Sequence, residues 1–338
     1  MEDVRPPSHF SRREFVQLGL AAGLFVSTEQ FAGASTGSSD IPYRELGSTG
    51  EKVSIIGVGG YHLGNAKDDD EAVRIVRNAL DSGINFLDNS WDYHDGLSEN
   101  RAGKALKDGY RNKAFVMTKL DSHSKEGATS QLNESLKRLG TDHVDLIQLH
   151  EVIRMDDPEK IFAEGGSIEA VIEAKKAGKA RFIGFTGHKS PKIHLHMLEV
   201  AKQHAFHFDT VQMPINVLDA HFESFGHQVV PVALEQKIGV LGMKPIASGQ
   251  AIKTKQLSAP ECLRFALSMP TSVVITGCES TTDLDQALTV ARTFKPMSKE
   301  EIAKLMQRTS EVAVKGEFEQ YKTTHVHDST MNNPQWLA

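Results

Sequence analysis

The chain has 338 residues, of which 39% are hydrophobic and 24% are charged, and its formal net charge is −6. This mild acidity supplies no basic field to attract a phosphate backbone, so it argues against nucleic-acid binding. Two cysteines, Cys262 and Cys278, are too few for a disulfide scaffold, a four-thiolate iron–sulfur cluster or a cysteine-rich zinc site. The composition is that of an ordinary enzyme with a large core.

The first residues contain the parts of an export signal in the expected order. Ser11-Arg12-Arg13-Glu14-Phe15 resembles the bacterial twin-arginine motif S-R-R-x-F, and an apolar run, Leu18–Val26, precedes an A-x-A end at Ala32–Ala34. We therefore predict a twin-arginine signal peptide over residues 1–34 and a linker over 35–42. An amphipathic helix or a disordered tail is the alternative.

This signal predicts where the protein works. The twin-arginine export machinery carries folded proteins, so we expect folding in the cytoplasm and then a periplasmic or otherwise exported product, with room for a cytoplasmic pool. A bilayer span needs about 20 apolar residues. The apolar run near the N-terminus is shorter, and no later segment is apolar enough, so no permanent membrane span is expected.

From Ser54 onward, short apolar runs alternate with longer amphipathic stretches. Most runs are continuously apolar, as in parallel strands buried on both faces. The eight runs are Ser54–Gly60, Phe86–Trp91, Ala114–Leu120, Val144–His150, Ala180–Gly187, Thr210–Asn216, Gly239–Pro245 and Ser272–Gly277. Eight strand–helix units at this length predict a (β/α)₈ TIM barrel over residues 43–294.

Other segments complete this prediction. Tyr43–Val53 is expected to form an N-terminal hairpin, Asp70–Ser82 an amphipathic helix, and residues 295–338 a C-terminal extension with a further helix and a polar tail. The alternative, a doubly wound nucleotide-binding sheet, needs a third glycine in its phosphate loop. His62 stands at that position in Gly57-Val58-Gly59-Gly60-Tyr61-His62, so the barrel is favoured.

Four polar side chains, Asp88, Tyr93, Lys119 and His150, lie at or just after the ends of neighbouring predicted strands, where barrels bind substrates. An ammonium beside a phenol lowers the phenol's pKa and eases proton transfer, and the ammonium needs a carboxylate because an unpaired buried charge is costly. His150 could hydrogen-bond an incoming oxygen. Together they fit proton delivery to a carbonyl oxygen, although singly they also read as an ion pair and a core histidine.

These residues resemble the aldo-keto reductase family, in a bacterial branch with a twin-arginine signal. The family element Asp-x-x-x-x-Tyr appears as Asp88-Asn89-Ser90-Trp91-Asp92-Tyr93, and Lys119 and His150 close apolar strands as in that family. The resemblance implies an NAD(P)H cofactor and reversible conversion of a small carbonyl or sugar to its alcohol. It makes Tyr93 the general acid and Lys119 the group that assists its ionisation. Asp88 then holds the lysine, and His150 positions the carbonyl.

The resemblance also assigns cofactor positions. Thr186-Gly187 stands where the family has Ser-Asn to bind the carboxamide, Gln212 matches its carboxamide-binding glutamine, and Met243, beside Lys244, replaces an aromatic residue that stacks on the nicotinamide. The full predicted set is Gly60, Thr186, Gly187, Gln212, Met243, Lys244, Gly277, Ser280 and Asp283.

Two of these positions bear on the choice between NADH and NADPH. Gly277 and Asp283 occupy the places of a lysine and an arginine that pair with the 2′-phosphate in typical NADP-dependent members. A carboxylate repels a phosphate but can accept a hydrogen bond from a ribose hydroxyl. Asp283 therefore argues against a strict NADPH preference, and the alternative is that it only caps the final helix.

The substrate pocket is expected to include Tyr61, His62 and Trp91, a polar-aromatic lining that suits sugars and small carbonyls. Two other functions stay open. One is a metal-dependent barrel hydrolase using Asp88, His150 and His188, although no H-x-H motif follows an early strand and no metal is expected. The other is a regulatory barrel that binds nucleotide with little turnover.

Overall fold

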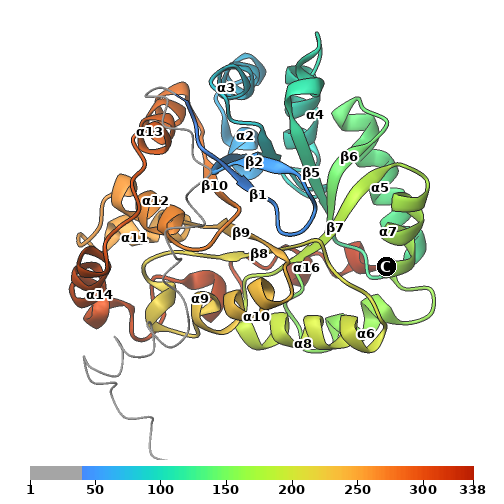
Figure 1. Ribbon diagram of the computed structural model, residues 1–338. Helices are drawn as coiled ribbons and strands as arrows, with labels where there is room; N and C mark the ends of the chain where they lie inside the picture. The colour runs from blue at the N-terminus through green and yellow to red at the C-terminus, as the bar shows by residue number, and fades with distance from the viewer. Residues whose placement is uncertain (1–39) are drawn as a thin grey trace, which may run out of the picture.

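The eight apolar runs form eight parallel strands that close into one barrel (Figure 1). In chain order they are β3 (Ile56–Gly59), β4 (Phe86–Asp88), β5 (Phe115–Leu120), β6 (Val144–Leu149), β7 (Ala180–Thr186), β8 (Thr210–Pro214), β9 (Gly239–Met243) and β10 (Val273–Gly277). Each strand pairs with the next, and β10 pairs with β3 to close the ring. The computed structural model describes residues 40–338, and over these residues it confirms the predicted (β/α)₈ TIM barrel.

Helices lie between the strands and surround the barrel (Figure 1). They are α2 (Gly60–Asn65), α3 (Asp69–Asp81), α4 (Leu97–Ala105), α5 (Lys125–Leu139), α6 (Asp157–Phe162), α7 (Ser167–Lys176), α8 (Pro191–Gln203), α9 (Phe225–Gln228), α10 (Val230–Glu235), α11 (Gln250–Lys253), α12 (Ala259–Ser268) and α13 (Thr281–Arg292). Short 3₁₀ helices are η2 (Tyr110–Lys113), η3 (Asp219–His221) and η4 (Ala247–Gly249). The expected helix over Asp70–Ser82 is α3, whose first turn is capped by the Asp68 carboxylate.

Most of the predicted strands run too far at their C-terminal ends, whereas β5 and β10 end at Leu120 and Gly277 as predicted. The run Phe86–Trp91 ends as a strand at Asp88, and the run Val144–His150 ends at Leu149. The residues that follow these strands lie in loops. The loop backbone still bonds to the neighbouring strand, and Trp91 N, for example, donates to Lys119 O at 3.1 Å. These loops form the C-terminal face of the barrel, which we call the barrel mouth.

The expected hairpin is confirmed and closes the opposite end of the barrel. It consists of β1 (Tyr43–Glu45) and β2 (Lys52–Ser54), which pair antiparallel. Leu46 and Val53 pack in the barrel interior with apolar side chains such as Phe86. The turn needs glycine at position 47, because Gly47 has φ +56° and a Cβ there would lie 2.4 Å from the backbone nitrogen of Gly239.

The chain beyond the barrel forms the further helix that was expected, α14 (Lys299–Ala313), and then the short helices α15 (Gln320–Thr323), α16 (Ser329–Asn332) and η5 (Pro334–Leu337). Residues 319–338, which we call the terminal segment, cross the barrel mouth rather than forming a polar tail, and Tyr321 is fully buried. The segment bonds to loops that follow four different strands, through the contacts His123 N to Leu337 O, Thr330 N to Glu151, His188 to Asp328, and Asn216 to Tyr321.

The predicted signal peptide and the predicted linker precede the barrel in the sequence. Residues 1–34 and most of the linker lie outside the described residues, and the proposed domain boundaries stay predictions. Among the helices of residues 40–338, none is both long enough and apolar enough to cross a bilayer. Cys262 and Cys278 are both buried and unpaired.

Candidate active site

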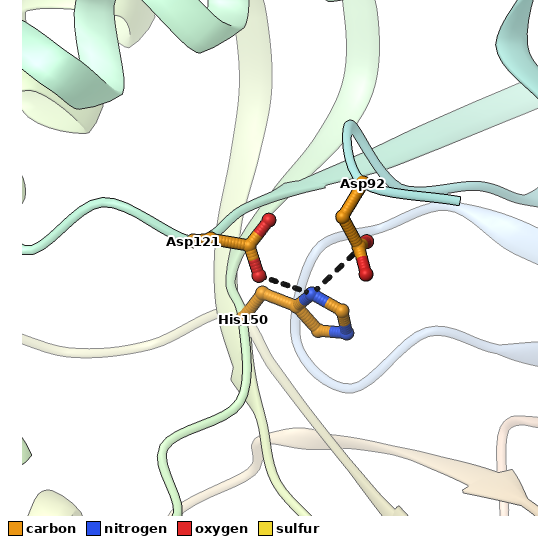
Figure 2. A group of neighbouring side chains, drawn as sticks. All are labelled: Asp92, Asp121 and His150. Carbon is orange, nitrogen blue, oxygen red and sulfur yellow. Dashed lines mark hydrogen bonds and ion pairs between the residues drawn. The ribbon is translucent and has the colours of Figure 1, made fainter. Parts of the chain in front are cut away.

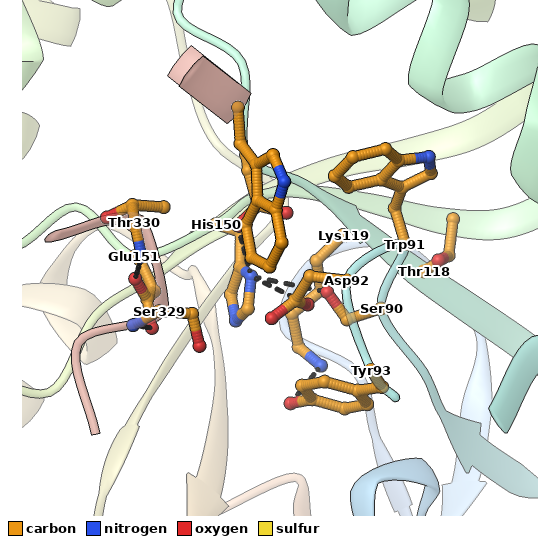
Figure 3. Close-up of polar contacts among 12 residues, drawn as sticks. Ser90, Trp91, Asp92, Tyr93, Thr118, Lys119, His150, Glu151, Ser329 and Thr330 are labelled. Atoms are coloured by element: carbon orange, nitrogen blue, oxygen red, sulfur yellow. Dashed lines mark hydrogen bonds and ion pairs between the residues drawn. The ribbon is translucent and has the colours of Figure 1, made fainter. Parts of the chain in front are cut away.

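The barrel mouth brings together three of the four predicted catalytic residues, Asp88, Tyr93 and Lys119, and Figure 3 shows the Lys119 ammonium beside the Tyr93 hydroxyl. Lys119, at the end of β5, donates from Nζ to Asp88 Oδ1 at 2.5 Å and to the Tyr93 hydroxyl at 3.0 Å. It also donates to Asn89 O at 2.7 Å. Gln212 Nε2 donates to the second oxygen of Asp88 at 2.5 Å. The carboxylate therefore ties together strands β4, β5 and β8.

The acidity of Tyr93 differs from the sequence-based expectation. Burial raises the pKa of Tyr93 well above its usual 10, and the carboxylates of Asp88 and Asp92 raise it further. The ammonium of Lys119 does not reverse this direction, because its charge is already paired with Asp88. Burial therefore opposes the ionisation of Tyr93 that Lys119 is expected to assist, and the assisting role of Lys119 stays a prediction.

His150 lies beside Tyr93, with the two ring centres 5.9 Å apart, but its polar contacts are with acids that the sequence analysis did not select (Figure 2). Its Nδ1 is 2.8 Å from Asp121 Oδ1 and 3.4 Å from Asp92 Oδ1. Burial lowers the pKa of His150, against the opposing effect of Asp92 and Glu151. Burial raises the pKa of Asp92 to about 7 and that of Asp121 well above its usual range.

Sequence reasoning missed Asp92, Asp121 and Glu151 although each stands within two residues of a selected residue. Two of these acids also bear on whether the site could bind a metal ion. In the described residues, Asp92, Asp121 and His150 offer ligand atoms within 4.8 Å of one another. The metal-dependent hydrolase considered in the sequence analysis would use Asp88, His150 and His188. In the structure, His188 instead bonds to Asp328 in the terminal segment at 2.9 Å.

The predicted carboxamide site shows two buried polar atoms that lack partners. Thr186 Oγ1 and Gln212 Oε1 are buried without a hydrogen-bond partner among the described residues. Thr186 and Gln212 are opposite each other in the β7–β8 ladder, so the two atoms form a donor and an acceptor side by side. A primary carboxamide has the complementary acceptor and donors. These residues therefore fit the nicotinamide carboxamide that the resemblance implies.

The glycines near this site leave no room for side chains. A Cβ at Gly60 would lie 2.4 Å from Asp88 O, and one at Gly187 would lie 2.3 Å from Val152 O. Met243 packs on the apolar barrel interior at the end of β9. Lys244 follows it with its ammonium 5.7 Å from the centre of the Tyr321 ring, and burial lowers the pKa of Lys244 to about 8.

Asp283 acts as a helix cap in the structure. Its Oδ2 accepts from the backbone nitrogens of Glu279 and Ser280 at 3.1 and 3.0 Å, and the Ser280 hydroxyl caps the N-terminus of α13 in return. Gly277 is covered by His62, since a Cβ there would lie 2.1 Å from the His62 ring. The His62 imidazole therefore covers Gly277, the position that the resemblance aligns with a lysine. His62 Nδ1 lies 2.9 Å from Glu279 Oε1.

The predicted pocket residues lie at the rim of the mouth. Tyr61 is half exposed and packs edge-on against Tyr93, with ring centres 5.5 Å apart. Trp91 donates its indole N–H to Glu134 at 2.8 Å and packs edge-on against Trp336 of the terminal segment. The terminal segment therefore contributes an aromatic wall that the sequence analysis did not include.

Comparisons with known proteins agree with this geometry. Residues 55–262 match the family model described as the Aldo/keto reductase family. The chain is 39% identical over 158 residues to L-galactose dehydrogenase from Arabidopsis thaliana, covering 44% of this chain and 49% of that protein. It is 30% identical over 214 residues to aldo-keto reductase YhdN from Bacillus subtilis (strain 168), covering 59% and 60%.

A solved structure extends the likeness beyond these partial alignments, which span half to three fifths of the relatives' lengths. An aldo-keto reductase from Bacillus halodurans, in its holo form, superposes with a TM-score of 0.67 at 25% identity, covering 82% of this chain and 99% of that one. With the family model matched over most of the barrel, this chain belongs to the aldo/keto reductase family.

Proposed function

We propose that this protein is an NAD(P)-dependent oxidoreductase that interconverts an aldehyde, ketone or sugar carbonyl and the corresponding alcohol. The family match and the oxidoreductase relatives support carbonyl–alcohol interconversion in general. The observation that carries the proposal is the buried ammonium of Lys119, which contacts Asp88 at 2.5 Å and the Tyr93 hydroxyl at 3.0 Å. That contact aims a phenol at the place where barrel enzymes bind their substrates.

The contact between Lys119 and Tyr93 fixes which way the phenol's hydrogen points. An ammonium can only donate hydrogen bonds, so the Tyr93 oxygen accepts and its own hydrogen is available to another acceptor. A substrate oxygen in the mouth can be that acceptor, and its negative charge during reduction strengthens the bond. Tyr93 acts on this oxygen as a general acid or, with its proton retained, as a hydrogen-bond donor.

The nicotinamide cofactor would supply or remove the hydride, and its carboxamide would be held by Thr186 and Gln212. The unpartnered oxygens of these two residues support that assignment. For the adenosine end we propose no strict NADPH preference, because Asp283 and Glu279 place carboxylates at the start of α13. Asp283 caps α13 by accepting hydrogen bonds from backbone N–H groups, so its carboxylate still lies at this end of the helix.

We propose a hydroxylated small molecule, such as a sugar, as the substrate. One relative is named L-galactose dehydrogenase, and the rim combines Tyr61, His62 and Trp91 with Trp336. Aromatic faces with polar edges pack against sugar rings and still bond to hydroxyls. A panel of aldoses and simple aldehydes, followed by nicotinamide absorbance, would identify the preferred class.

Tyr93→Phe tests the proposed function. We expect turnover to fall by about 10²–10³-fold, the usual cost of removing one donor to a developing oxyanion, while nucleotide affinity changes little. Tyr110→Phe is the matched control, because Tyr110 bonds to Asp81 on the outside of the barrel and should leave turnover unchanged. A regulatory barrel would bind nucleotide but show no turnover to lose, and a metal hydrolase would lose activity to chelators.

We further propose export by the twin-arginine route, supported by Arg12 and Arg13 in the S-R-R-x-F motif. A freely exchanging nicotinamide has no supply outside the cytoplasm, so an exported enzyme would retain its cofactor tightly or work partly in the cytoplasm. Fractionation of cells that carry Arg12→Lys/Arg13→Lys checks the route. An unchanged distribution would remove the export proposal.

A further inference from the structure

A buried group of two carboxylates and one imidazole lies at the barrel mouth, where it is formed by the loops that follow β4, β5 and β6 (Figure 2). Asp92, Asp121 and His150 are only 8%, 0% and 8% exposed. His150 Nδ1 lies 2.8 Å from Asp121 Oδ1 and 3.4 Å from Asp92 Oδ1. One ligand atom from each of the three residues lies within 4.8 Å of the others. Three segments of the barrel therefore bring three metal-ligating side chains to one point.

The two carboxylates lack the basic partner that buried carboxylates normally have. Within residues 40–338, neither Asp92 nor Asp121 forms an ion pair with a lysine or an arginine, and the ammonium of Lys119 is already paired with Asp88 at 2.5 Å. The imidazole of His150, even as a cation, offsets one negative charge of the two. A divalent cation offsets both.

Two oxygens of this group make no hydrogen bond. Asp92 Oδ1 and Asp121 Oδ2 are buried and accept from no donor among the described residues. A buried carboxylate oxygen without a partner is costly, because it has lost its water and gained nothing in exchange. Figure 2 shows the two carboxylates facing each other across the Nδ1 side of the ring. The lone pairs of both carboxylates are therefore available to a cation at this point.

The spacing and the kinds of atom indicate which cation fits. Bonds of about 2.0–2.2 Å to a tetrahedral ion place neighbouring ligand atoms about 3.3–3.6 Å apart. The distance of 3.4 Å from His150 Nδ1 to Asp92 Oδ1 has this value, and the distance of 2.8 Å to Asp121 Oδ1 needs to lengthen by about half an ångström. An imidazole ligand favours Zn²⁺ and its first-row neighbours over Mg²⁺ and Ca²⁺, which prefer oxygen ligands alone.

We propose that Asp92, Asp121 and His150 bind one divalent transition-metal ion of the Zn²⁺ type, with Nδ1 as the imidazole ligand. Three protein ligands leave one position of a tetrahedral ion for water or for the Ser90 hydroxyl, which lies 3.2 Å from Nδ1. This site differs from the metal site of a barrel hydrolase considered above, because Asp88 is excluded from it by its pairing with Lys119.

The ion holds the imidazole in place and takes no part in breaking or forming bonds. A neutral imidazole that binds a metal through Nδ1 carries its proton on Nε2, so the ring presents an N–H donor on its other side. His150 stands beside Tyr93 at the mouth, with the two ring centres 5.9 Å apart. Binding of the ion is independent of the proposed function, and its test needs neither nucleotide nor substrate.

Titration of the 338-residue chain with Zn²⁺, without a polyhistidine tag, tests the proposal. The protein is first treated with a chelator and then freed of it. We expect calorimetry to show one tightly bound ion per chain, and the Tm to rise with Zn²⁺ concentration, as binding to the folded state requires. Co²⁺ in place of Zn²⁺ should give the intense visible absorption of a four- or five-coordinate ion. Ions held only by surface histidines would keep the weak absorption of hydrated Co²⁺.

Substitutions of the two acids locate the ion. Asp92→Asn and Asp121→Asn should each weaken Zn²⁺ binding by at least about 100-fold, because even loss of a group that only supports a ligand costs about 10–100-fold. Asp142→Asn is the matched control, because Asp142 lies 2.7 Å from His143 Nδ1 in an exposed pair, and it should bind Zn²⁺ as the unchanged protein does.

Two results would overturn the proposal. One is that the unchanged protein binds no Zn²⁺ at millimolar concentration, which would leave protons to neutralise the two acids. The other is that Asp92→Asn and Asp121→Asn bind Zn²⁺ as tightly as Asp142→Asn, which would place the ion on surface histidines. If neither variant folds, the Co²⁺ spectrum of the unchanged protein decides, and a spectrum of hydrated Co²⁺ counts against the site.

Discussion

Replacing Lys119 by methionine should destabilise the fold as well as abolish activity. Lys119 and Asp88 are only 1% and 3% exposed, and the ammonium makes a 2.5 Å contact with the carboxylate. Without the lysine, Asp88 keeps one donor, the neutral amide of Gln212. Removing one partner of a buried ion pair leaves an uncompensated charge and costs about 3–5 kcal/mol. We expect Lys119→Met to lose stability in that range.

Two further variants make this estimate specific. Asp88→Asn/Lys119→Met removes both charges and keeps an amide for Gln212, so it should recover most of the lost stability while remaining inactive. Lys113→Met is the matched control, because Lys113 pairs with Asp81 at 2.7 Å but both side chains are about half exposed. An exposed pair contributes about 1 kcal/mol or less.

Urea unfolding of the four proteins at neutral pH measures these differences. The reasoning is refuted if Lys119→Met loses no more stability than Lys113→Met, or if the double variant is no more stable than Lys119→Met. Either result would mean that water or rearranged donors compensate Asp88 inside the barrel. Loss of activity alone would not distinguish these cases, which is why stability is the quantity measured.

Three other outcomes follow from the structure. Gly47→Ala should lower the stability of the fold by about 2–4 kcal/mol, because Gly47 has a positive φ and a Cβ there would lie 2.4 Å from Gly239 N. Gly50→Ala, with open space around it, should lower stability less. Thermal unfolding measures both variants, and an equal fall in Tm would contradict this reasoning. Burial works to raise the pKa of Asp328, but bonds from His188, Lys189 and His325 outweigh it and hold the pKa well below its usual value. Asp328→Asn should therefore lose roughly 2–3 kcal/mol in urea unfolding at neutral pH, and this difference should shrink as pH falls below about 4; a pH-independent difference would contradict it. Finally, kcat/KM for NADH and NADPH should agree within about tenfold, and a strong NADPH preference would contradict the role given to Asp283.

The barrel and its first catalytic contacts could be predicted because local patterns determine them. Continuous apolar runs specify strands buried on both faces, and residues at the ends of neighbouring parallel strands must meet. Asp88, Tyr93 and Lys119 therefore come together as expected. The C-terminal ends of the strands were harder to predict, because the residue at which a strand stops pairing depends on contacts with other parts of the chain. Strand β4, for example, ends at Asp88, before Asn89.

The acidic surroundings of the site could not be read in the same way. Asp92 and Asp121 follow strands in loops, where carboxylates are usually solvated, and only the folded chain shows them buried against His150. Burial first, and then the charges of nearby acids such as Asp88 and Asp92, raise the pKa of Tyr93. The terminal segment was missed because its contacts, such as Asn216 with Tyr321, join residues far apart in sequence.

The most direct test of hydride transfer follows the hydrogen itself. The protein is incubated with reduced nicotinamide dinucleotide that carries deuterium at both positions of the reactive ring carbon, together with aldoses and simple aldehydes, and the product alcohol is examined by mass spectrometry. We predict one deuterium on the former carbonyl carbon for each cofactor oxidised, with Tyr93→Phe strongly slowed. Cofactor oxidation that leaves no deuterium in the product, or no oxidation with any carbonyl, would contradict the proposed function.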